Sequence, residues 1–543
     1  MAFLYTPTAT DWLRLAPELI VGVAALLVLL VDLVLPEQRR AWLSGVALLG
    51  VLGAAAAVAY LLATSSYGSA FFFMITSDPT AMLADAEILF TAGVAILLSP
   101  SYLRHQGIGH QGEYYTLVLL ATGGMMLMAA ATNLMTIFVG LELLSLALYI
   151  LAAYVANRLT SQEAGMKYFL LSSFASGFLL YGMALTYGAT GTTSLSGIRN
   201  YLIGHPFLAA SGYGPLLIAG LALMAVGFCF KVSTVPFHTW TPDVYVGAPT
   251  TITAFMSVGT KVAAFVALAR VFLLALYPQH AYWQPIFWAV AILSMVVGNF
   301  LAVTQTDVKR MLAYSSVAHA GYIMVGIATG TVLGFSAVLV YLATYAVMNL
   351  GAFGVVLVLE RRNGTGTTLG DYAGLARRQP VLAAVMLICM LSLAGVPPSA
   401  GFVGKWDVFY AAIVGGHLEL AIVGILASVL GMFYYLRVIW AMYFVEPATV
   451  PVPAAASPVL APQPALVAVA VASGSAGAGA MAVATAAGAG PAPFAHPPHN
   501  PPVGSTVESW VALTIATVLT LLLGIIPGPL FVFAIQVATV FVR

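Results

Sequence analysis

Charge is what this sequence most lacks. Only 7% of its 543 residues are Asp, Glu, Lys or Arg, whereas water-soluble domains carry about 25%. So few charges cannot cover a water-exposed surface for the whole chain, which excludes an entirely water-soluble protein. The formal net charge of +1 also gives no basic surface that would suit a nucleic acid.

Cysteine is nearly absent as well. The two cysteines, Cys229 and Cys389, lie in separate apolar runs, and neither has a partner at metal-ligand spacing. This pattern excludes a disulfide framework and gives no zinc or iron–sulfur signature. A basic leader with a small-residue cleavage site is also missing from "MAFLYTPTATDWLRLAPELIVGVAALL", so we expect this stretch to lead into a retained first membrane span.

Hydrophobic residues make up 61% of the chain, in runs that recur almost from end to end. A helix that spans a bilayer needs about 20 mostly apolar residues. The runs are solidly apolar and do not alternate as the strands of a membrane barrel would. We therefore predict an all-α polytopic membrane protein with about fourteen transmembrane helices. The predicted spans are residues 15–35, 41–62, 82–103, 114–131, 133–156, 162–187, 212–232, 251–276, 282–304, 311–329, 332–360, 380–413, 418–445 and 507–541.

Lysine and arginine predict the orientation, because cytoplasmic loops carry the positive excess. With fourteen spans and an N-terminus outside, ten of the nineteen basic residues fall in inside loops and three in outside segments. The inside residues are Arg39, Arg40, Arg104, Arg158, Lys309, Arg310, Arg361, Arg362, Arg377 and Arg378. The outside residues are Arg14, Arg199 and Arg543. The six others fall within spans: Lys167, Lys231, Lys261, Arg270, Lys405 and Arg437.

Prolines interrupt two of the spans. Pro236 and Pro242 lie in the extension of the seventh span, and "AGVPPSAG" interrupts the twelfth. Proline removes a backbone donor and breaks a helix, and irregular backbone at membrane depth needs protein or a water-filled cavity around it. Paired broken helices in the two halves of a chain indicate a translocation path. Because the second break follows five spans after the first, we predict two inverted five-helix repeats, spans 4–8 and spans 9–13, that contain broken helices 7 and 12.

The predicted organisation has five parts. Residues 1–113 hold spans 1–3, 114–276 the first repeat, 282–445 the second repeat, 446–506 a linker and 507–543 the last span. The linker is rich in Ala, Pro and Gly, and it has neither Lys nor Arg between 447 and 504. Such a composition is typical of a flexible connection. All predicted spans but the last precede the linker, so with the N-terminus outside it lies in the cytoplasm. An extra interfacial helix is the alternative for its apolar centre.

Buried charge points to function. A charged residue near the bilayer centre costs about 2.5–3.5 kcal/mol on insertion scales, so it usually faces the protein interior. Glu142 and Lys261 lie about nine and ten residues into their spans, near mid-membrane, while Lys231 and Lys405 flank the two helix breaks. For these four residues we favour a functional role over snorkelling, in which a side chain near a span end reaches the headgroups.

The remaining membrane charges are more ambiguous. Snorkelling fits Lys167 and Arg270 at least as well as a functional role. His319 fits either a satisfied core histidine or a functional one. The separations of Lys231 from Lys261 and of Lys405 from Arg437 are 30 and 32 residues, which matches the predicted repeats.

A chain of Glu, Lys and His side chains suits proton relay. The sequence has no cluster of carboxylates for Na⁺ and no nucleotide or haem motif. Burial lowers the pKa of a lysine and a nearby carboxylate raises it, so a charge that approaches or retreats can make a lysine release or take up a proton.

Four stretches carry a family resemblance: "FKVSTVPFHTWTPDVYVGAPTTITAFMSVGTKVAAF", "GNFLAVTQTDVKRMLAYSSVAHAGYIMVG", "LSLAGVPPSAGFVGKW" and "LELLSLALYILAAY". They closely resemble the antiporter-like subunit N family of proton-pumping NADH–quinone oxidoreductase (respiratory complex I). The likeness covers nearly all spans; the linker at 447–504 departs from it. The resemblance implies a fourteen-helix membrane-arm subunit that transfers protons in the bacterial inner membrane.

The resemblance also implies roles for single residues. Glu142 and Lys231 correspond to a coupling pair, Lys261 to the central relay lysine and Lys405 to the outlet lysine. Further relay candidates are His238, His319, Lys167 and Arg437. No cofactor is expected on this chain, and NADH, FMN, iron–sulfur clusters and quinone are expected in partner subunits. The adjacent antiporter-like subunit and small hydrophobic subunits are the expected neighbours.

Two alternatives stay open at this point. A subunit of a multisubunit Na⁺/H⁺ antiporter shares the broken helices, although "TPDVYVGAPT" favours the oxidoreductase, and Lys405 disfavours the sister subunit M, which typically has a glutamate there. The other alternative is a non-pumping scaffold that bridges neighbouring membrane subunits, against which the buried lysines argue.

Overall fold

The structure is a computed structural model. It describes residues 6–36, 40, 42–109, 111–205, 214–362, 364–446 and 503–542. Most of the predicted linker, residues 447–502, therefore lies outside the described residues.

Almost all described elements are helices. The first half contains α1 (Ala9–Arg14), α2 (Ala16–Val34), α3 (Trp42–Ala63), α4 (Pro79–Gln106), α5 (Gly112–Ala130), α6 (Leu134–Ala152), α7 (Leu159–Thr190), α8 (Leu195–Gly204), α9 (Gly214–Lys231), α10 (Trp240–Gly247) and α11 (Thr250–Ala269). The π-helix η3 (Arg270–Ala275) and the 3₁₀ turn η4 (Tyr277–Gln279) follow.

The second half has the same character. It contains α12 (His280–Val303), α13 (Val308–Ala328), α14 (Val332–Leu359), the 3₁₀ turn η5 (Leu369–Tyr372), α15 (Leu375–Arg378), α16 (Pro380–Ala394), α17 (Ala400–Val414), α18 (Leu418–Phe444), α19 (Val507–Ile525) and α20 (Gly528–Val542). Two short antiparallel strands, β1 (Ser69–Ala70) and β2 (Ile75–Thr76), form a hairpin between α3 and α4.

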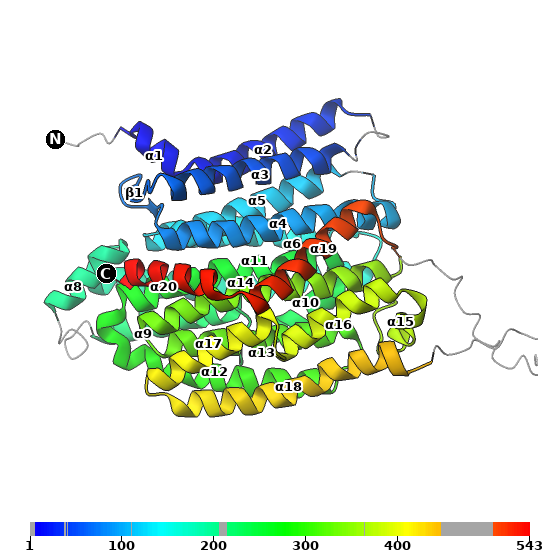
Figure 1. The fold of residues 1–543 in the computed structure, drawn as a ribbon. Helices are drawn as coiled ribbons and strands as arrows, with labels where there is room; N and C mark the ends of the chain where they lie inside the picture. The colour runs from blue at the N-terminus through cyan, green and yellow to red at the C-terminus, as the bar shows by residue number, and fades with distance from the viewer. Residues whose placement is uncertain are drawn as a thin grey trace, which may run out of the picture.

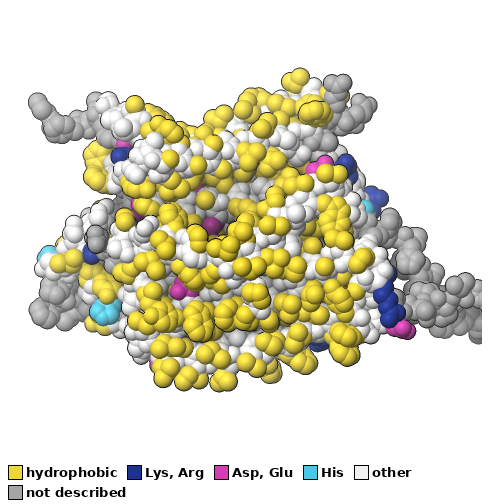
Figure 2. All heavy atoms as spheres, viewed as in Figure 1, with side chains coloured by type: hydrophobic (Ala, Val, Ile, Leu, Met, Phe, Trp, Pro, Cys, Tyr) yellow, Lys and Arg dark blue, Asp and Glu magenta, His cyan; other side chains and the backbone are white. Residues whose placement is uncertain are grey.

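The long helices lie side by side along one common direction (Figure 1). Thirteen of the described helices are long and apolar enough to cross a membrane. Hydrophobic side chains cover the middle of the face in Figure 2, and basic side chains gather at its right-hand edge. Helices α11, α13 and α14 form the buried centre, with about nine-tenths of their apolar windows buried inside the protein. The polytopic all-α prediction is confirmed.

Both predicted helix breaks are present. Between α9 and α10 the chain leaves the helix at Val232 and resumes it at Trp240, and between α16 and α17 it does so from Gly395 to Ser399. Each break contains one cis prolyl peptide bond, at Val235–Pro236 and at Pro397–Pro398. In Figure 1 the chain runs from α9 rightward to α10, whereas it runs from α16 leftward to α17. This opposite course agrees with inverted repeats, which stay a prediction.

Close backbone approach fixes the second break. A Cβ on Gly401 would lie 1.8 Å from the carbonyl oxygen of Ser392, so only glycine allows the first turn of α17 to reach the last turn of α16. The Gly401 amide also donates to Ser392 Oγ at 3.0 Å. Gly395, with φ of +86°, ends α16 in the left-handed conformation that glycine adopts without strain.

Two expectations from the sequence need correction. The last span is not one helix, because α19 ends at Ile525 and α20 begins at Gly528 after Pro527, which cannot continue the backbone hydrogen bonds. Arg270 does not snorkel, because it is only 1% exposed. Its guanidinium instead binds both carboxylate oxygens of Asp78, at 2.7 and 2.8 Å, and the carbonyl oxygen of Ala129.

The orientation is open to a direct test. The N- and C-terminal ends lie on the same side in Figure 1, and the chain enters and leaves the linker on the opposite side. We expect a single cysteine at Ser457, in the linker, to react with an impermeant maleimide only from the cytoplasmic side of oriented membrane vesicles. A cysteine at Ser66, after α3, should react only from the other side. Reversed labelling would contradict the positive-inside assignment.

Candidate functional site: buried lysines at two broken helices

Lys261 lies near the middle of α11 and is 1% exposed. Its Nζ donates to the carbonyl oxygen of Val232 at 3.4 Å. Val232 is the first residue after α9, at the start of the first helix break. The ammonium group of Lys261 thus contacts the backbone at a point where the broken helix leaves a carbonyl oxygen available.

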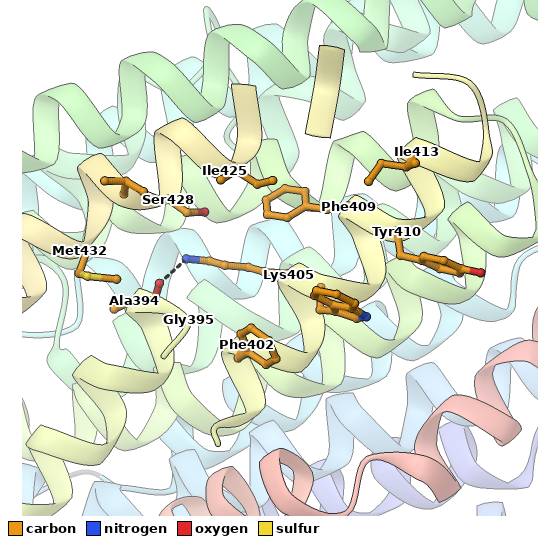
Figure 3. Close-up of a pocket in the computed structure, with 12 residues that line it drawn as sticks. Ala394, Gly395, Phe402, Lys405, Phe409, Tyr410, Ile413, Ile425, Ser428 and Met432 are labelled. Atoms are coloured by element: carbon orange, nitrogen blue, oxygen red, sulfur yellow. Dashed lines mark hydrogen bonds between the residues drawn. The ribbon is translucent and has the colours of Figure 1, made fainter. Parts of the chain in front are cut away.

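Lys405 makes the corresponding contact at the second break. Its Nζ donates to the carbonyl oxygens of Leu393 and Ala394, at 3.1 and 2.9 Å, which are the last residues of α16. Figure 3 shows the side chain of Lys405 extended between Phe409 and Gly395, with its amine beside Ala394 and Ser428. A mostly apolar cavity of about 340 Å³ borders it, lined by residues of α17 and α18 and by the end of α16.

The two contacts share one physical basis. The last carbonyls of a helix have no partner within the helix, and the helix dipole places about half a negative charge at that end. A half-helix that ends inside the membrane is therefore a site for a cation. In the part of the chain that the structure describes, neither Lys231, Lys261 nor Lys405 forms an ion pair with a carboxylate. Backbone and hydroxyl oxygens hold these three ammonium groups instead.

Lys231 ends α9 and is 2% exposed. Its Nζ donates to Ser145 Oγ at 2.7 Å and to Tyr168 Oη at 3.3 Å. Ser145 follows Glu142 by three residues on α6, and residues so spaced share one helix face. Glu142 Oε1 is buried and has no hydrogen-bond partner. Glu142 therefore lies on the same face of α6 as Ser145, the serine that Lys231 contacts.

His319, in the middle of α13, is 1% exposed. Its ring nitrogens contact two tyrosine hydroxyls, with Nδ1 at 2.8 Å from Tyr341 Oη and Nε2 at 3.1 Å from Tyr435 Oη. The Tyr322 ring is near both His319 and Lys405: its centroid is 5.8 Å from the imidazole centroid and 5.1 Å from Lys405 Nζ. Titratable groups thus continue from the second break into the buried centre.

The other relay candidates lie elsewhere. His238 is in the first break, half-buried, with a buried Nδ1 that has no hydrogen-bond partner. The side chain of Lys167 is 40% exposed and forms ion pairs with Glu163 and Asp243. Arg437 donates to the carbonyl oxygens of Val303 and Gln305, where it caps the end of α12. Like Lys261 it contacts backbone carbonyl oxygens at a helix end, but it is only half-buried, so the similar sequence separations of the two pairs do not give equal surroundings.

Several buried acids were not singled out from the sequence. Asp85 and Glu87 on α4 and Asp407 on α17 are at most 9% exposed, and each has a buried carboxylate oxygen without a hydrogen-bond partner. Glu360, at the end of α14, is fully buried, forms an ion pair with Arg158 at 3.2 Å and accepts from Thr250. All four acids fall within predicted spans, and a carboxylate inside a span was the signal that could have found them.

Comparisons with known proteins agree with this geometry. Residues 131–431 match the sequence model of the family described as NADH:quinone oxidoreductase/Mrp antiporter, TM. NADH-quinone oxidoreductase subunit N of Trichlorobacter lovleyi is 46% identical over 79% of this chain and 86% of its own length. Subunit N of Chloroflexus aggregans is also 46% identical, over 82% and 90%. The chain belongs to the NADH-quinone oxidoreductase subunit N family.

Solved structures give the same family fold. A chain of respiratory complex I from Thermus thermophilus with bound aureothin is 32% identical, with a TM-score of 0.71 over 95% of this chain and 98% of that one. A chain of the Mrp complex from Dietzia is 23% identical, with a TM-score of 0.76 over 98% and 97%. At that identity the second likeness shows the fold alone.

Among the described residues, no three His, Cys, Asp or Glu side chains come together as they would around a metal ion. Cys229 and Cys389 are buried and unpaired with one another. The side chains described at this site carry carboxylate, amine, imidazole and hydroxyl groups.

Proposed function

We propose that this chain transfers protons across the membrane as subunit N of an NADH–quinone oxidoreductase, and that Glu142, Lys231, Lys261 and Lys405 bind the protons. His319 is proposed to carry protons between the two lysines at the helix breaks. The observation that supports this most strongly is the placement of two buried ammonium groups on the carbonyl ends of two broken helices.

The broken helices provide a way to change the proton affinity of each lysine. A carbonyl oxygen close to Nζ stabilises the ammonium form, and a carbonyl that moves away leaves a buried charge uncompensated, which favours the neutral amine. Small rearrangements of the unwound residues can thus load or unload a lysine. Glu142 acts on the first lysine of the series, Lys231, across Ser145.

The redox chemistry belongs to other chains in this proposal. Curated relatives of this chain are named as subunits of NADH-quinone oxidoreductase. NADH, FMN, iron–sulfur clusters and quinone are proposed to be held by partner subunits, and this chain to bind none of them. Its neighbours are proposed to be an adjacent antiporter-like subunit and small hydrophobic subunits of the membrane arm, in a bacterial inner membrane with the N-terminus outside.

Purification of the native complex tests the assembly. An affinity tag on this chain should recover chains that carry flavin and iron–sulfur clusters, together with NADH–quinone reductase activity. Recovery of a complex without flavin but with Na⁺-dependent proton exchange would favour the antiporter alternative. The scaffold alternative is tested by the Lys261 variants described in the Discussion.

A further inference from the structure

The C-terminal end of α10 is held by side chains from three other segments of the chain. A helix leaves its last four carbonyl oxygens without partners inside the helix, and in α10 each of these oxygens accepts a hydrogen bond from a side chain. The bonds run from Thr253 Oγ1 to Tyr245, from Arg158 Nη2 to Val246 and Gly247, and from Lys309 Nζ to Ala248, at 2.8, 3.4, 3.1 and 2.8 Å. Two of the three donors are therefore cations.

Glu360 is the anion that faces both cations. It ends α14 and is fully buried, with Oε1 at 3.2 Å from Arg158 Nη1, and Oε2 accepts from the Thr250 hydroxyl. Lys309 is close enough to Glu360 to interact with its charge. The backbone carbonyl of Glu360 accepts from the Val503 amide at 2.8 Å. The carboxylate is thus fixed in place between the two cations and the start of α11.

Glu360 balances the charge at this end of the helix. The side chain of Arg158 is 12% exposed and Lys309 is 2% exposed, so water screens neither cation well. The carbonyl end of a helix offers only about half a negative charge, which is less than two cations need. Loss of one partner from a buried ion pair leaves a charge uncompensated and is strongly destabilising. Without Glu360, therefore, the two cations would repel each other and leave the carbonyl end of α10.

The other end of α10 contacts the surroundings of Lys231. Trp240, the first residue of α10, stacks on Tyr168 with ring centroids 4.7 Å apart and an interplanar angle of 7°. Its Nε1 also donates to the carbonyl oxygen of Phe230, in the last turn of α9, at 3.1 Å. Tyr168 Oη accepts the hydrogen bond from Lys231 Nζ at 3.3 Å. The position of α10 therefore sets the position of the tyrosine that contacts the first buried lysine.

We propose that Glu360 is a positioning residue for Lys231, which it reaches through the two cations that hold the carbonyl end of α10. Rearrangement at the first helix break is then confined to residues 232–239, while α10 keeps its place as Lys231 gains or loses a proton. Glu360 itself passes no proton to Lys231. This inference rests on the proposed function, in which Lys231 binds protons.

Hydrogen–deuterium exchange of the native complex in lipid nanodiscs tests the fixed position of α10. We expect the amides of residues 241–248 to exchange equally slowly at rest and during turnover with NADH and quinone. The amides of residues 232–239 should exchange faster during turnover. Faster exchange of α10 during turnover would overturn the proposal, because a helix held at its end by Glu360 should not open as the lysine is loaded.

Glu360→Gln tests the carboxylate. Because both cations lose their anion, the amides of α10 should exchange roughly a hundredfold faster, while those of α11 stay protected. Pumping per assembled complex should fall roughly tenfold, the result of a misplaced site. Glu446→Gln is the control, because Glu446 pairs with Arg377 at 3.3 Å and both are well exposed, so neither measurement should change. A carboxylate that serves only stability predicts faster exchange without loss of pumping, and that result would overturn the proposal.

A second substitution restores the balance of charge. Lys309→Gln in the Glu360→Gln background removes one cation and keeps an N–H donor for the Ala248 carbonyl, so most of the protection and of the pumping should return. If Glu360 or Lys309 carried protons, the double variant would pump more slowly than the single one, which would contradict the positioning role. If Glu360→Gln fails to assemble, the double variant decides, and an assembled double variant with an unprotected α10 would overturn the proposal.

Failure of this inference is distinguishable from failure of the proposed function. Exchange of α10 is measured without reference to pumping, and Lys261 makes no contact with the end of α10 among the hydrogen bonds of the described residues. A Lys261→Met complex that pumps like the wild type contradicts the relay. An α10 that stays protected in Glu360→Gln contradicts only the positioning role.

Discussion

Glu142→Gln is expected to leave assembly of the complex unchanged and to lower proton pumping by about a hundredfold, the usual scale for loss of a positioned proton-transfer group. The amide keeps the shape of the side chain and removes its charge. Because Glu142 Oε1 has no hydrogen-bond partner, the amide breaks no bond at that atom. What is lost is a negative charge on the α6 face that carries Ser145, the hydroxyl partner of Lys231.

Acidification of proteoliposomes that contain the complex, driven by NADH, measures this effect per assembled complex. Glu113→Gln provides the control, because Glu113 is an exposed acid in the first turn of α5 and its loss should not change pumping. If Glu142→Gln pumps like the wild type, Glu142 is not part of the relay, and Lys231 would act only with Ser145 and Tyr168.

The spans and their breaks could be predicted because they depend on local sequence. A run of about 20 apolar residues is sufficient to indicate a helix in a membrane, and prolines mark where such a helix must stop. The stretch "AGVPPSAG" therefore indicated the interval between α16 and α17. Pro527 carried the same signal in the last span and was passed over, because the apolar run continues on both sides of it.

The buried lysines could be predicted, but their partners could not. A lysine in mid-span is visible in the sequence, whereas the oxygen that it contacts belongs to another segment. Lys261 contacts the carbonyl of Val232, and Lys231 contacts Ser145 on a different helix. Backbone carbonyls are present at every residue, so no residue type identifies the one that a helix break leaves available.

Arg270 shows the same limit, because its partner could not be identified from the sequence either. Its place near the end of a span suggested a side chain that reaches the headgroups, because the partner was not visible. Asp78 precedes it by 192 residues and begins α4. The packing of α4 against α11 brings Asp78 to this arginine, and that packing is a tertiary property.

Lys261 is the residue at which substitution should have the largest effect. Its ammonium group is buried near the centre of α11 and donates to the Val232 carbonyl oxygen. If Lys261 relays protons, the position needs a group that gains and loses a proton. Lys261→Met keeps roughly the volume and removes the proton site, so the fold should be unchanged or more stable while pumping falls by about a hundredfold.

Two further variants separate charge from titration. Lys261→Arg keeps the positive charge but hardly deprotonates, so it should also pump poorly. Lys261→His restores a group that titrates near neutral pH. It should pump roughly several-fold faster than the arginine or the methionine variant, because a positioned proton-transfer group raises the rate. A structural cation predicts another order, in which arginine is tolerated best and methionine fails to assemble.

The most direct test of the relay is the initial rate of NADH-driven proton translocation in proteoliposomes, normalised to bound flavin, for Lys261→Met and Lys261→His side by side. A proton relay through Lys261 predicts an assembled methionine variant that scarcely pumps and a histidine variant that pumps measurably faster. An assembled methionine variant that translocates protons at the wild-type rate would contradict it.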